Sequence, residues 1–304
     1  MASQIQIALL TGGQTAEREI ALLSAQNVCK ALESRVHVDL FDLPSDLDDF
    51  FRNRRRYACA IPVFHGKGGE DGTVQGFFET LGIPYIFSGV EAHAIGMDKA
   101  MTKTILAAQG IKTADWIVLK PGDAYSWQYP VVVKPLDQGS SVGVGLVRAQ
   151  EEFASAHTKA FACSDHVLVE RLVEGKEFTV AVVDHDGKSQ ALPVIEIRSK
   201  NAFFDFESKY DPALCDELCP APIDEALAAR LQEVALAAHK GIGARHLSRT
   251  DMIVDRDGET WFLEINTIPG LTSASLTPKA IAAAGLNLSD LLIEWIAEVT
   301  EKRP

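Results

Sequence analysis

The chain of 304 residues contains only five cysteines, and no two of them form a Cys-x-x-Cys pair. Cys215 and Cys219 are separated by three residues. A zinc site built on them would need a second pair or a nearby histidine, and the sequence offers neither. We therefore expect no zinc site, and we expect the thiols to be reduced, as in a cytoplasmic protein.

Positive charge is also scarce, with 29 lysines and arginines against 42 aspartates and glutamates and a net charge of −13. Because phosphate backbones attract basic surfaces, this balance disfavours nucleic acid as a partner. It still permits a small phosphorylated ligand held by a few local cations. No apolar run approaches the length of a membrane span, and residues 5–10 are too short for a signal-peptide core. We expect a cytoplasmic protein without membrane contact.

Apolar residues are plentiful, at 47% of the chain, which is enough for two or three compact units. The first ninety residues alternate short apolar strands (5–10, 36–41 and 57–64) with a helical pattern over 16–32. This alternation predicts an open parallel sheet, whose ligands bind beyond the carboxyl ends of the strands. The glycine-bearing loops at 12–13 and 65–72 fall there, but no third glycine completes a dinucleotide fingerprint.

After residue 96 the pattern changes to a mixture of α and β segments. We predict helices over 97–109, 150–161 and 224–240 and a closing helix, with strands over 116–119, 131–134, 144–147, 167–170, 178–183 and 192–197. The fold class is thus α/β and α+β, in three units covering 1–95, 96–170 and 171–304. A loop rich in aromatic and charged residues, 199–220, is expected to act as a lid.

Residues 249–266 read as a hairpin, because Asp-Arg-Asp-Gly at 255–258 favours a tight turn. Centring the turn there pairs Asp251 with Phe262 and Glu264 with Arg249. Arg249, Asp251, Glu264 and Asn266 then share one face, with the two acids as diagonal neighbours roughly 7–8 Å apart. The opposite face is predicted to enter the core with Met252, Val254, Trp261, Leu263 and Ile265.

Two carboxylates and an amide oxygen at that distance indicate a cation site. Mg²⁺ fits best, because it takes oxygen ligands and keeps positions open for substrate phosphates. Arg249 would add a fixed positive charge where an oxyanion could develop. A solvated hairpin face with incidental charges is an equally open interpretation of the hairpin by itself.

The segment 134–145 carries Lys134 and a run of glycines and serines between two apolar strands. Such a run lets backbone N–H groups approach a phosphate closely. The segment lacks the Gly-Lys-Ser/Thr ending and the following helix of a Walker loop. It therefore predicts a flap over a triphosphate, with a flexible hairpin turn as the alternative.

Glu170 and Glu177 flank the expected junction between the second and third units, and junctions commonly hold ligands. Glu170 could accept from an exocyclic amine, and Glu177 from ribose hydroxyls. Two surface acids on a connector remain an equally open reading of this segment.

Taken together, these segments resemble the ATP-grasp ligases, and further motifs resemble the D-alanine–D-alanine ligase family. The motifs occur in order along the whole chain: GGQTAERE at 12–19, HGKGGEDG at 65–72, MDK at 97–99, GSSVG at 139–143, ESKY at 207–210 and EINTIPGLTSASL at 264–276. The resemblance implies ATP-dependent joining of two D-alanines through an acyl phosphate, for peptidoglycan precursor synthesis. It also implies a homodimer.

The resemblance implies roles for the residues that match these motifs. Glu17 and His65 would bind the first D-alanine, while Arg249 and the Gly270 backbone would stabilise the tetrahedral intermediate. Ser275 and Leu276 would hold the second carboxylate. The closing loops would carry Ser140, Lys209 and Tyr210, linked to Glu17 by hydrogen bonds.

The same resemblance implies a second set of residues, which bind ATP and two Mg²⁺ ions that Mn²⁺ could replace. ATP would contact Lys99, Lys134, Ser140, Ser141, Glu170, Arg171, Val173 and Glu177, and the metal ions would contact Asp251, Glu264 and Asn266.

Departures from the family pattern are few. Arg171 stands where many relatives have Lys, Val173 where many have Leu, and Ala274 replaces a His found in some members. A ligase that uses D-lactate or D-serine as the second substrate is the alternative within this class, and Tyr210 favours the dipeptide former. A non-catalytic ATP-binding module is the alternative from another class.

Overall fold

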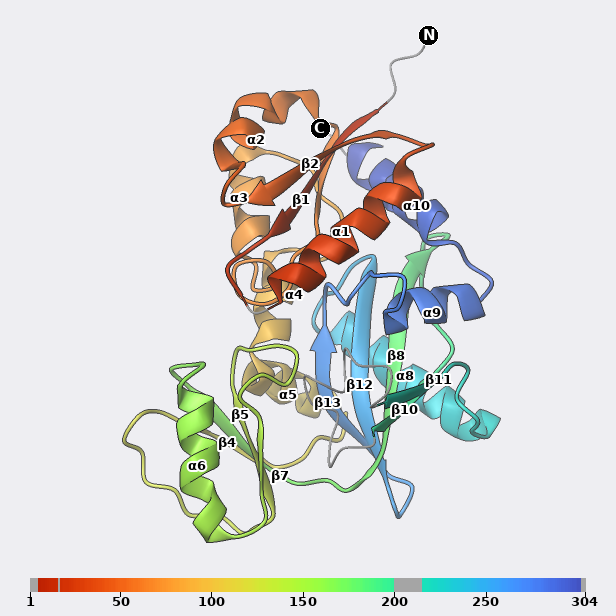
Figure 1. Cartoon of the computed structure of the whole chain (residues 1–304). Helices are drawn as coiled ribbons and strands as arrows, with labels where there is room; N and C mark the ends of the chain where they lie inside the picture. The colour runs from red at the N-terminus through yellow and green to blue at the C-terminus, as the bar shows by residue number, and fades with distance from the viewer. Residues whose placement is uncertain (1–4, 16, 200–214, 302–304) are drawn as a thin grey trace.

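The computed structural model describes residues 5–15, 17–199 and 215–301. Their strands form three sheets, one parallel and two largely antiparallel (Figure 1). The predicted fold class, α/β and α+β with an open parallel sheet at the N-terminus, is confirmed. The three sheets fall within the predicted units 1–95, 96–170 and 171–304, apart from Arg171 at the end of one strand. These boundaries remain a proposal, and the first falls inside a helix, α4 (Val90–Met97).

The N-terminal sheet has the strand order β2-β1-β3, with every pair parallel. Its strands are β1 (Gln6–Gly12), β2 (His37–Leu43) and β3 (Cys59–Pro62). β1 is almost wholly buried because it is central and covered on both faces, which explains its continuous apolar run. The helices that surround it are α1 (Arg18–Leu32), α2 (Leu47–Asn53) and α3 (Thr73–Leu81).

The second sheet is antiparallel, in the order β4-β7-β5-β6. It consists of β4 (Trp116–Leu119), β5 (Val131–Pro135), β6 (Gly145–Val147) and β7 (Val167–Arg171). Helix α6 (Gln150–Phe161) packs on it through Ala156 and Ala160, which join the buried valines of the strands. The predicted strand–loop–strand layout of 134–145 is confirmed, since β5 and β6 pair on either side of that loop.

The third sheet follows the order β11-β10-β8-β12-β13, with β9 paired to β8. Its strands are β8 (Gly175–His185), β9 (Lys188–Ala191), β10 (Ile195–Ser199), β11 (Cys215–Leu218), β12 (Leu247–Asp255) and β13 (Thr260–Asn266). Helix α8 (Glu225–Gly241) covers one face, where Leu231 and Ala235 meet Phe178 and Met252. The predicted strand 192–197 was placed too early, because Leu192 precedes β10.

The predicted hairpin pairs, Asp251 with Phe262 and Glu264 with Arg249, are wrong, because the observed register is shifted by one residue next to the turn and by two beyond a β-bulge. Asp251 lies directly opposite Glu264, whereas Met252 lies opposite Phe262, so Leu263 has no partner in β12. A bulge inserts one residue into one strand and resets the alternation of side chains beyond it. Phe262, which is 1% exposed, therefore enters the core instead of Trp261 and Leu263, both of which are only half-buried.

The C-terminal helices return to the N-terminal sheet. α9 (Leu276–Ala283) is followed by α10 (Leu288–Glu301), which packs against α1 and β3. Trp295 is fully buried there and donates to the Asp184 carbonyl at 2.7 Å. One apolar cluster thus spans the first and last elements of the chain, which fixes the N-terminal sheet over the third sheet (Figure 1).

Within the described ranges, no single helix is long and apolar enough to cross a membrane. α9 and α10 meet that criterion only when counted together across a bend of 97°.

Candidate active site

Two adjoining cavities, of about 920 and 1000 Å³, lie among the three sheets. Both are lined by Lys99, Gln138 and Glu264, so these residues mark where the cavities meet. Lys99 begins helix α5 (Lys99–Ala108), and Glu264 lies on β13. Two compartments that share a charged boundary can hold two ligands end to end.

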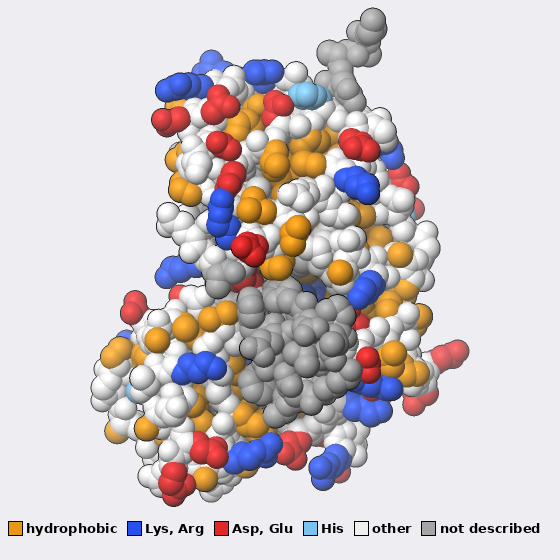
Figure 2. Space-filling view, viewed as in Figure 1, with side chains coloured by type: hydrophobic (Ala, Val, Ile, Leu, Met, Phe, Trp, Pro, Cys, Tyr) orange, Lys and Arg blue, Asp and Glu red, His pale blue; other side chains and the backbone are white. Residues whose placement is uncertain are grey.

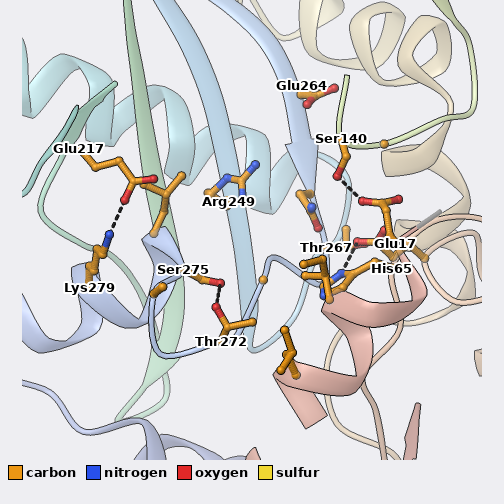
Figure 3. Close-up of a pocket in the computed structure, with 18 of the residues that line it drawn as sticks. Glu17, His65, Ser140, Glu217, Arg249, Glu264, Thr267, Thr272, Ser275 and Lys279 are labelled. Atoms are coloured by element: carbon orange, nitrogen blue, oxygen red, sulfur yellow. Dashed lines mark hydrogen bonds and ion pairs between the residues drawn. The ribbon is translucent and has the colours of Figure 1, made fainter. Parts of the chain in front are cut away.

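The first cavity is lined by ten of the predicted site residues, contributed by all three units (Figure 3). They are Glu17, His65, Lys99, Ser140, Arg249, Glu264, Asn266, Gly270, Ser275 and Leu276. Only the tertiary structure joins them, because they are spread over 260 positions of sequence (276 − 17 + 1).

Glu17, just before α1, meets the loop between β5 and β6. Ser140 Oγ donates to Glu17 Oε1 (Figure 3), and Glu17 is buried. A Cβ on Gly139 would lie 3.1 Å from Glu17 Oε2, so the loop approaches this carboxylate as closely as it does because residue 139 is glycine. Ser140 and Ser141 both have positive φ, at 49° and 58°, an uncommon conformation for residues with a side chain. The predicted contact between Glu17 and Ser140 is present.

His65 is buried at the end of β3, where it faces α1. Its Nε2 lies 3.3 Å from Ser24 Oγ and its Nδ1 lies 4.0 Å from Glu70 Oε1. Ser24 Oγ also accepts from the Leu271 backbone at 3.2 Å. This chain of contacts connects the loop at 65–72 with the segment that follows β13.

At the far side of the first cavity, the loop 270–275 leads into α9. Thr272 Oγ1 and Ser275 Oγ are 2.8 Å apart, and a Cβ on Gly270 would lie 2.8 Å from Ser275 Oγ. Lys279, one turn into α9, forms an ion pair with Glu217 of β11 (Figure 3). Neither residue was predicted, although Lys279 lies one turn beyond Ser275 and therefore on the same side of the helix.

The second cavity is lined by nine of the predicted residues: Lys99, Lys134, Ser141, Glu170, Arg171, Val173, Glu177, Asp251 and Glu264. Arg171 lies with its guanidinium 4.7 Å from the centre of the Trp261 ring. Leu263, which the bulge turns away from the core, lines the same cavity. A cavity with apolar walls and a few charged groups suits a nucleotide.

Glu170 lies between two lysines. Lys134 Nζ is 2.5 Å from its Oε1, and Lys103 Nζ is 2.8 Å from its Oε2. Burial would raise the pKa of Glu170, but the charges of Lys134 and Lys103 outweigh it and hold the pKa below its usual range. The sequence pointed to Lys134 and missed Lys103, although Lys103 follows Lys99 by one helical turn and so shares its face.

Asp251 and Arg249 form a two-point pair on β12. Arg249 Nε and Nη2 donate to Asp251 Oδ1 and Oδ2 at 2.9 and 2.8 Å, and Thr179 Oγ1 donates to Oδ1 at 2.6 Å. Across the hairpin, Glu264 Oε2 lies 3.7 Å from Lys99 Nζ. The arrangement fixes Arg249 toward the first cavity, which it lines.

The oxygen ligands predicted for Mg²⁺ are Asp251, Glu264 and Asn266. All three lie on the face of the hairpin that is turned toward the two cavities. Asp251 is directly opposite Glu264, and Asn266, opposite Arg249, is the next residue of β13 on that face. Two carboxylates and an amide oxygen are the kind of donors that Mg²⁺ takes. Asn266 Oδ1 also accepts from the Ile268 backbone at 2.9 Å, which orients it. The donor set therefore fits the predicted metal.

Lys209 and Tyr210, with most of the predicted lid 199–220, lie outside the described residues. At its described end the prediction of a loop is wrong, because β11 pairs with β10 as a strand of the third sheet. On the face seen in Figure 2, the basic and acidic side chains of the described ranges are interspersed, with no continuous basic area there. This agrees with the acidic composition.

Two largely antiparallel sheets that enclose a charged, nucleotide-sized cavity define an ATP-grasp enzyme. The family model for the D-ala D-ala ligase C-terminus matches residues 105–297, and the model for the N-terminus of the same ligase matches residues 44–88. The chain therefore belongs to the D-alanine–D-alanine ligase family.

Individual relatives agree with this membership. The chain is 39% identical to a D-alanine–D-alanine ligase of Desulfotalea psychrophila, covering 99% of this chain and 97% of the relative. The D-alanine–D-alanine ligase of Bacillus anthracis complexed with ATP superposes with a TM-score of 0.84 at 33% identity, covering 99% and 98%. The VanG D-Ala:D-Ser ligase of Enterococcus faecalis superposes with 0.82 at 28% identity, covering 98% and 100%.

Proposed function

We propose that this protein joins two D-alanine molecules into D-alanyl-D-alanine, converting ATP to ADP and phosphate, and so supplies a peptidoglycan precursor. The observation that carries the proposal is the pair of adjoining cavities with Lys99 and Glu264 at their boundary. One cavity suits a nucleotide, and the other has a carboxylate and a guanidinium for a small zwitterion. Membership of the ligase family supports the assignment of both.

In the second cavity, Lys99 and Lys134 bind the triphosphate of ATP, and Ser141 lies on the flap above it. Glu170, Arg171, Val173 and Glu177 surround the adenine and ribose. Lys99 Nζ already donates to the Gln138 carbonyl at 2.6 Å, which holds its charge at the boundary between the cavities. Positioning and electrostatic stabilisation are the main means by which proteins accelerate phosphoryl transfer.

In the first cavity, Glu17 pairs with the ammonium of the first D-alanine, and His65 lies near its carboxylate. A carboxylate oxygen of that D-alanine attacks the γ-phosphorus, and the bond from phosphorus to the ADP oxygen breaks. The product is an acyl phosphate, whose carbonyl carbon is a much better electrophile than a carboxylate.

The second D-alanine is held by its carboxylate at Ser275 and Leu276. Its neutral amine attacks the acyl carbon, and Arg249 with the Gly270 N–H stabilises the oxyanion of the tetrahedral adduct. Phosphate then leaves with the electrons of the C–O bond, and the proton released by the amine nitrogen passes to the departing phosphate. Ser140 on the flap, bonded to Glu17, helps to exclude water, which would hydrolyse the acyl phosphate.

Asp251, Glu264 and Asn266 would hold the Mg²⁺ ions. Bound there, the metal would supply positive charge against the phosphates. We assign the protein to the cytoplasm, where its substrates are made, and we propose that it is a homodimer. The alternative of a non-catalytic module predicts loss of these charged groups, yet within the described ranges each predicted ligand lines one of the two cavities.

Phosphate release from Mg²⁺-ATP should depend on D-alanine. We expect at least roughly tenfold more phosphate with D-alanine than without it, because the acceptor carboxylate is needed for transfer. The measurement is a phosphate assay combined with detection of the dipeptide by mass spectrometry. L-Alanine serves as the control substrate. Equal phosphate release with and without D-alanine, and no dipeptide, would refute the proposed reaction.

D-Alanine should be preferred over D-lactate and D-serine as the second substrate at neutral pH. The similarity in fold to a D-Ala:D-Ser ligase does not decide this, because the same sheets can serve either nucleophile. The test is competition between equal concentrations of the nucleophiles at pH 7, followed by product analysis. A majority of ester or D-alanyl-D-serine product would overturn the preference while leaving the ligase activity intact.

A further inference from the structure

Helix α5 carries two lysines one turn apart, each paired with an acid that lines a cavity. Lys99 at its start lies 3.7 Å from Glu264, and Lys103 lies 2.8 Å from Glu170. The Lys99 side chain is 8% exposed, whereas the Lys103 side chain is 0% exposed and lines neither cavity. Lys103 therefore has no direct access to a ligand.

A lysine buried to this degree costs free energy unless its charge is paired. Burial lowers the pKa of Lys103, and Glu170 counteracts the effect. Lys103 Nζ also donates to Thr113 Oγ1 at 2.5 Å and lies 5.5 Å from the centre of the Trp116 ring. These neighbours fix the ammonium in one place.

Lys134 differs from Lys103 in its position and in its access to the second cavity. It lines that cavity, and its Nζ is 2.5 Å from the other oxygen of Glu170. When Lys134 turns to a phosphate, Glu170 needs another cation, because an unpaired buried carboxylate is strongly unfavourable. Lys103 is the cation that remains paired with Glu170 when Lys134 moves away.

We propose that Lys103 is a positioning residue for ATP: it is the permanent counter-ion of Glu170 and thereby releases Lys134 to the triphosphate. The inference rests on the proposed assignment of ATP to the second cavity. Without Lys103, Glu170 would retain Lys134 as its only cationic partner among the described residues, and the phosphates would lose a cation. The adenosine part of the ligand would be affected much less.

Calorimetric titration with ATP and with adenosine, in the presence of Mg²⁺ and without D-alanine, tests this on the full chain. The variants are K103M and K134M, with K112M as a matched control because Lys112 forms an exposed ion pair with Glu259. We expect the preference for ATP over adenosine to fall roughly tenfold in K103M and in K134M, within the range of coupling seen for neighbours in one ion-pair network. It should not change in K112M.

A role of Lys103 in folding alone would weaken both ligands equally, so an unchanged preference in K103M would overturn the proposal. If K103M does not fold, K103Q gives the same comparison, because glutamine can still bond Thr113 but carries no charge. If the preference for ATP over adenosine falls in K103M as expected, but the wild-type protein forms no dipeptide, the proposed reaction is refuted and the role of Lys103 is unaffected.

Discussion

Replacing Glu264 by Gln should lower the turnover number by a factor on the order of 10³ or more, while the fold persists. Glu264 faces both cavities and lies directly opposite Asp251 across the hairpin. The amide removes one of two acids that would hold a divalent cation, and such a cation stabilises the transition state by several kcal/mol. The measurement is kcat for D-alanine-dependent phosphate release, with circular dichroism to confirm the fold.

The matched control is E259Q, the same change on the same hairpin. Glu259 is half-exposed and pairs with Lys112 at 3.0 Å, away from both cavities, so kcat should stay within about twofold. Asp251→Asn is expected to be as damaging as E264Q, with an added effect from weakening the pair with Arg249. Near-normal turnover in E264Q would show that the hairpin acids do not bind the metal.

Replacing Arg249 by Met should lower kcat by roughly 10²–10³-fold, the loss typical when an oxyanion donor is removed. The guanidinium lines the first cavity and is held at two points by Asp251 at 2.8 and 2.9 Å. Arg249→Lys should restore little of the activity, because an ammonium cannot reproduce a two-point pair. Steady-state kinetics at saturating ATP and D-alanine give the comparison.

Binding of ATP separates this role from damage to the nucleotide site. Arg249 does not line the second cavity, so the dissociation constant for ATP should change by no more than about threefold in R249M. Arg230→Met is the control, because Arg230 donates to the Gly258 carbonyl at the turn of the same hairpin and lines neither cavity. If R249M retains kcat, the oxyanion role is wrong.

The hairpin shows which structural features an alternating sequence pattern can predict and which it cannot. Alternation correctly placed Arg249, Asp251, Glu264 and Asn266 on one face, because the period of a strand is local. The bulge at Leu263 could not be predicted, because it depends on how β13 packs. Phe262 N donates to the Lys112 carbonyl, and Thr113 Oγ1 donates to the Phe262 carbonyl. These contacts come from a segment about 150 residues away, at the end of α5 and before β4.

Glu170 gives the complementary case. The sequence identified it as a candidate acid at a junction but assigned it only a ligand role. The structure places it between Lys103 and Lys134, which are 67 and 36 positions earlier in the chain (170 − 103 and 170 − 134). No local pattern links these three residues, because a helix and two strands of separate segments bring them together.

The sequence by itself determined many of the strands and helices, the acidic character and the types of chemical group available, because periodicity and turn residues act over a few positions. Only the tertiary structure decided that seventeen of the predicted site residues lie around two adjoining cavities, since α10 and the shared apolar cluster bring the N-terminal sheet over β12 and β13. It also decided which charges are paired, because ion pairs depend on burial and distance, and neither can be read from spacing along the chain.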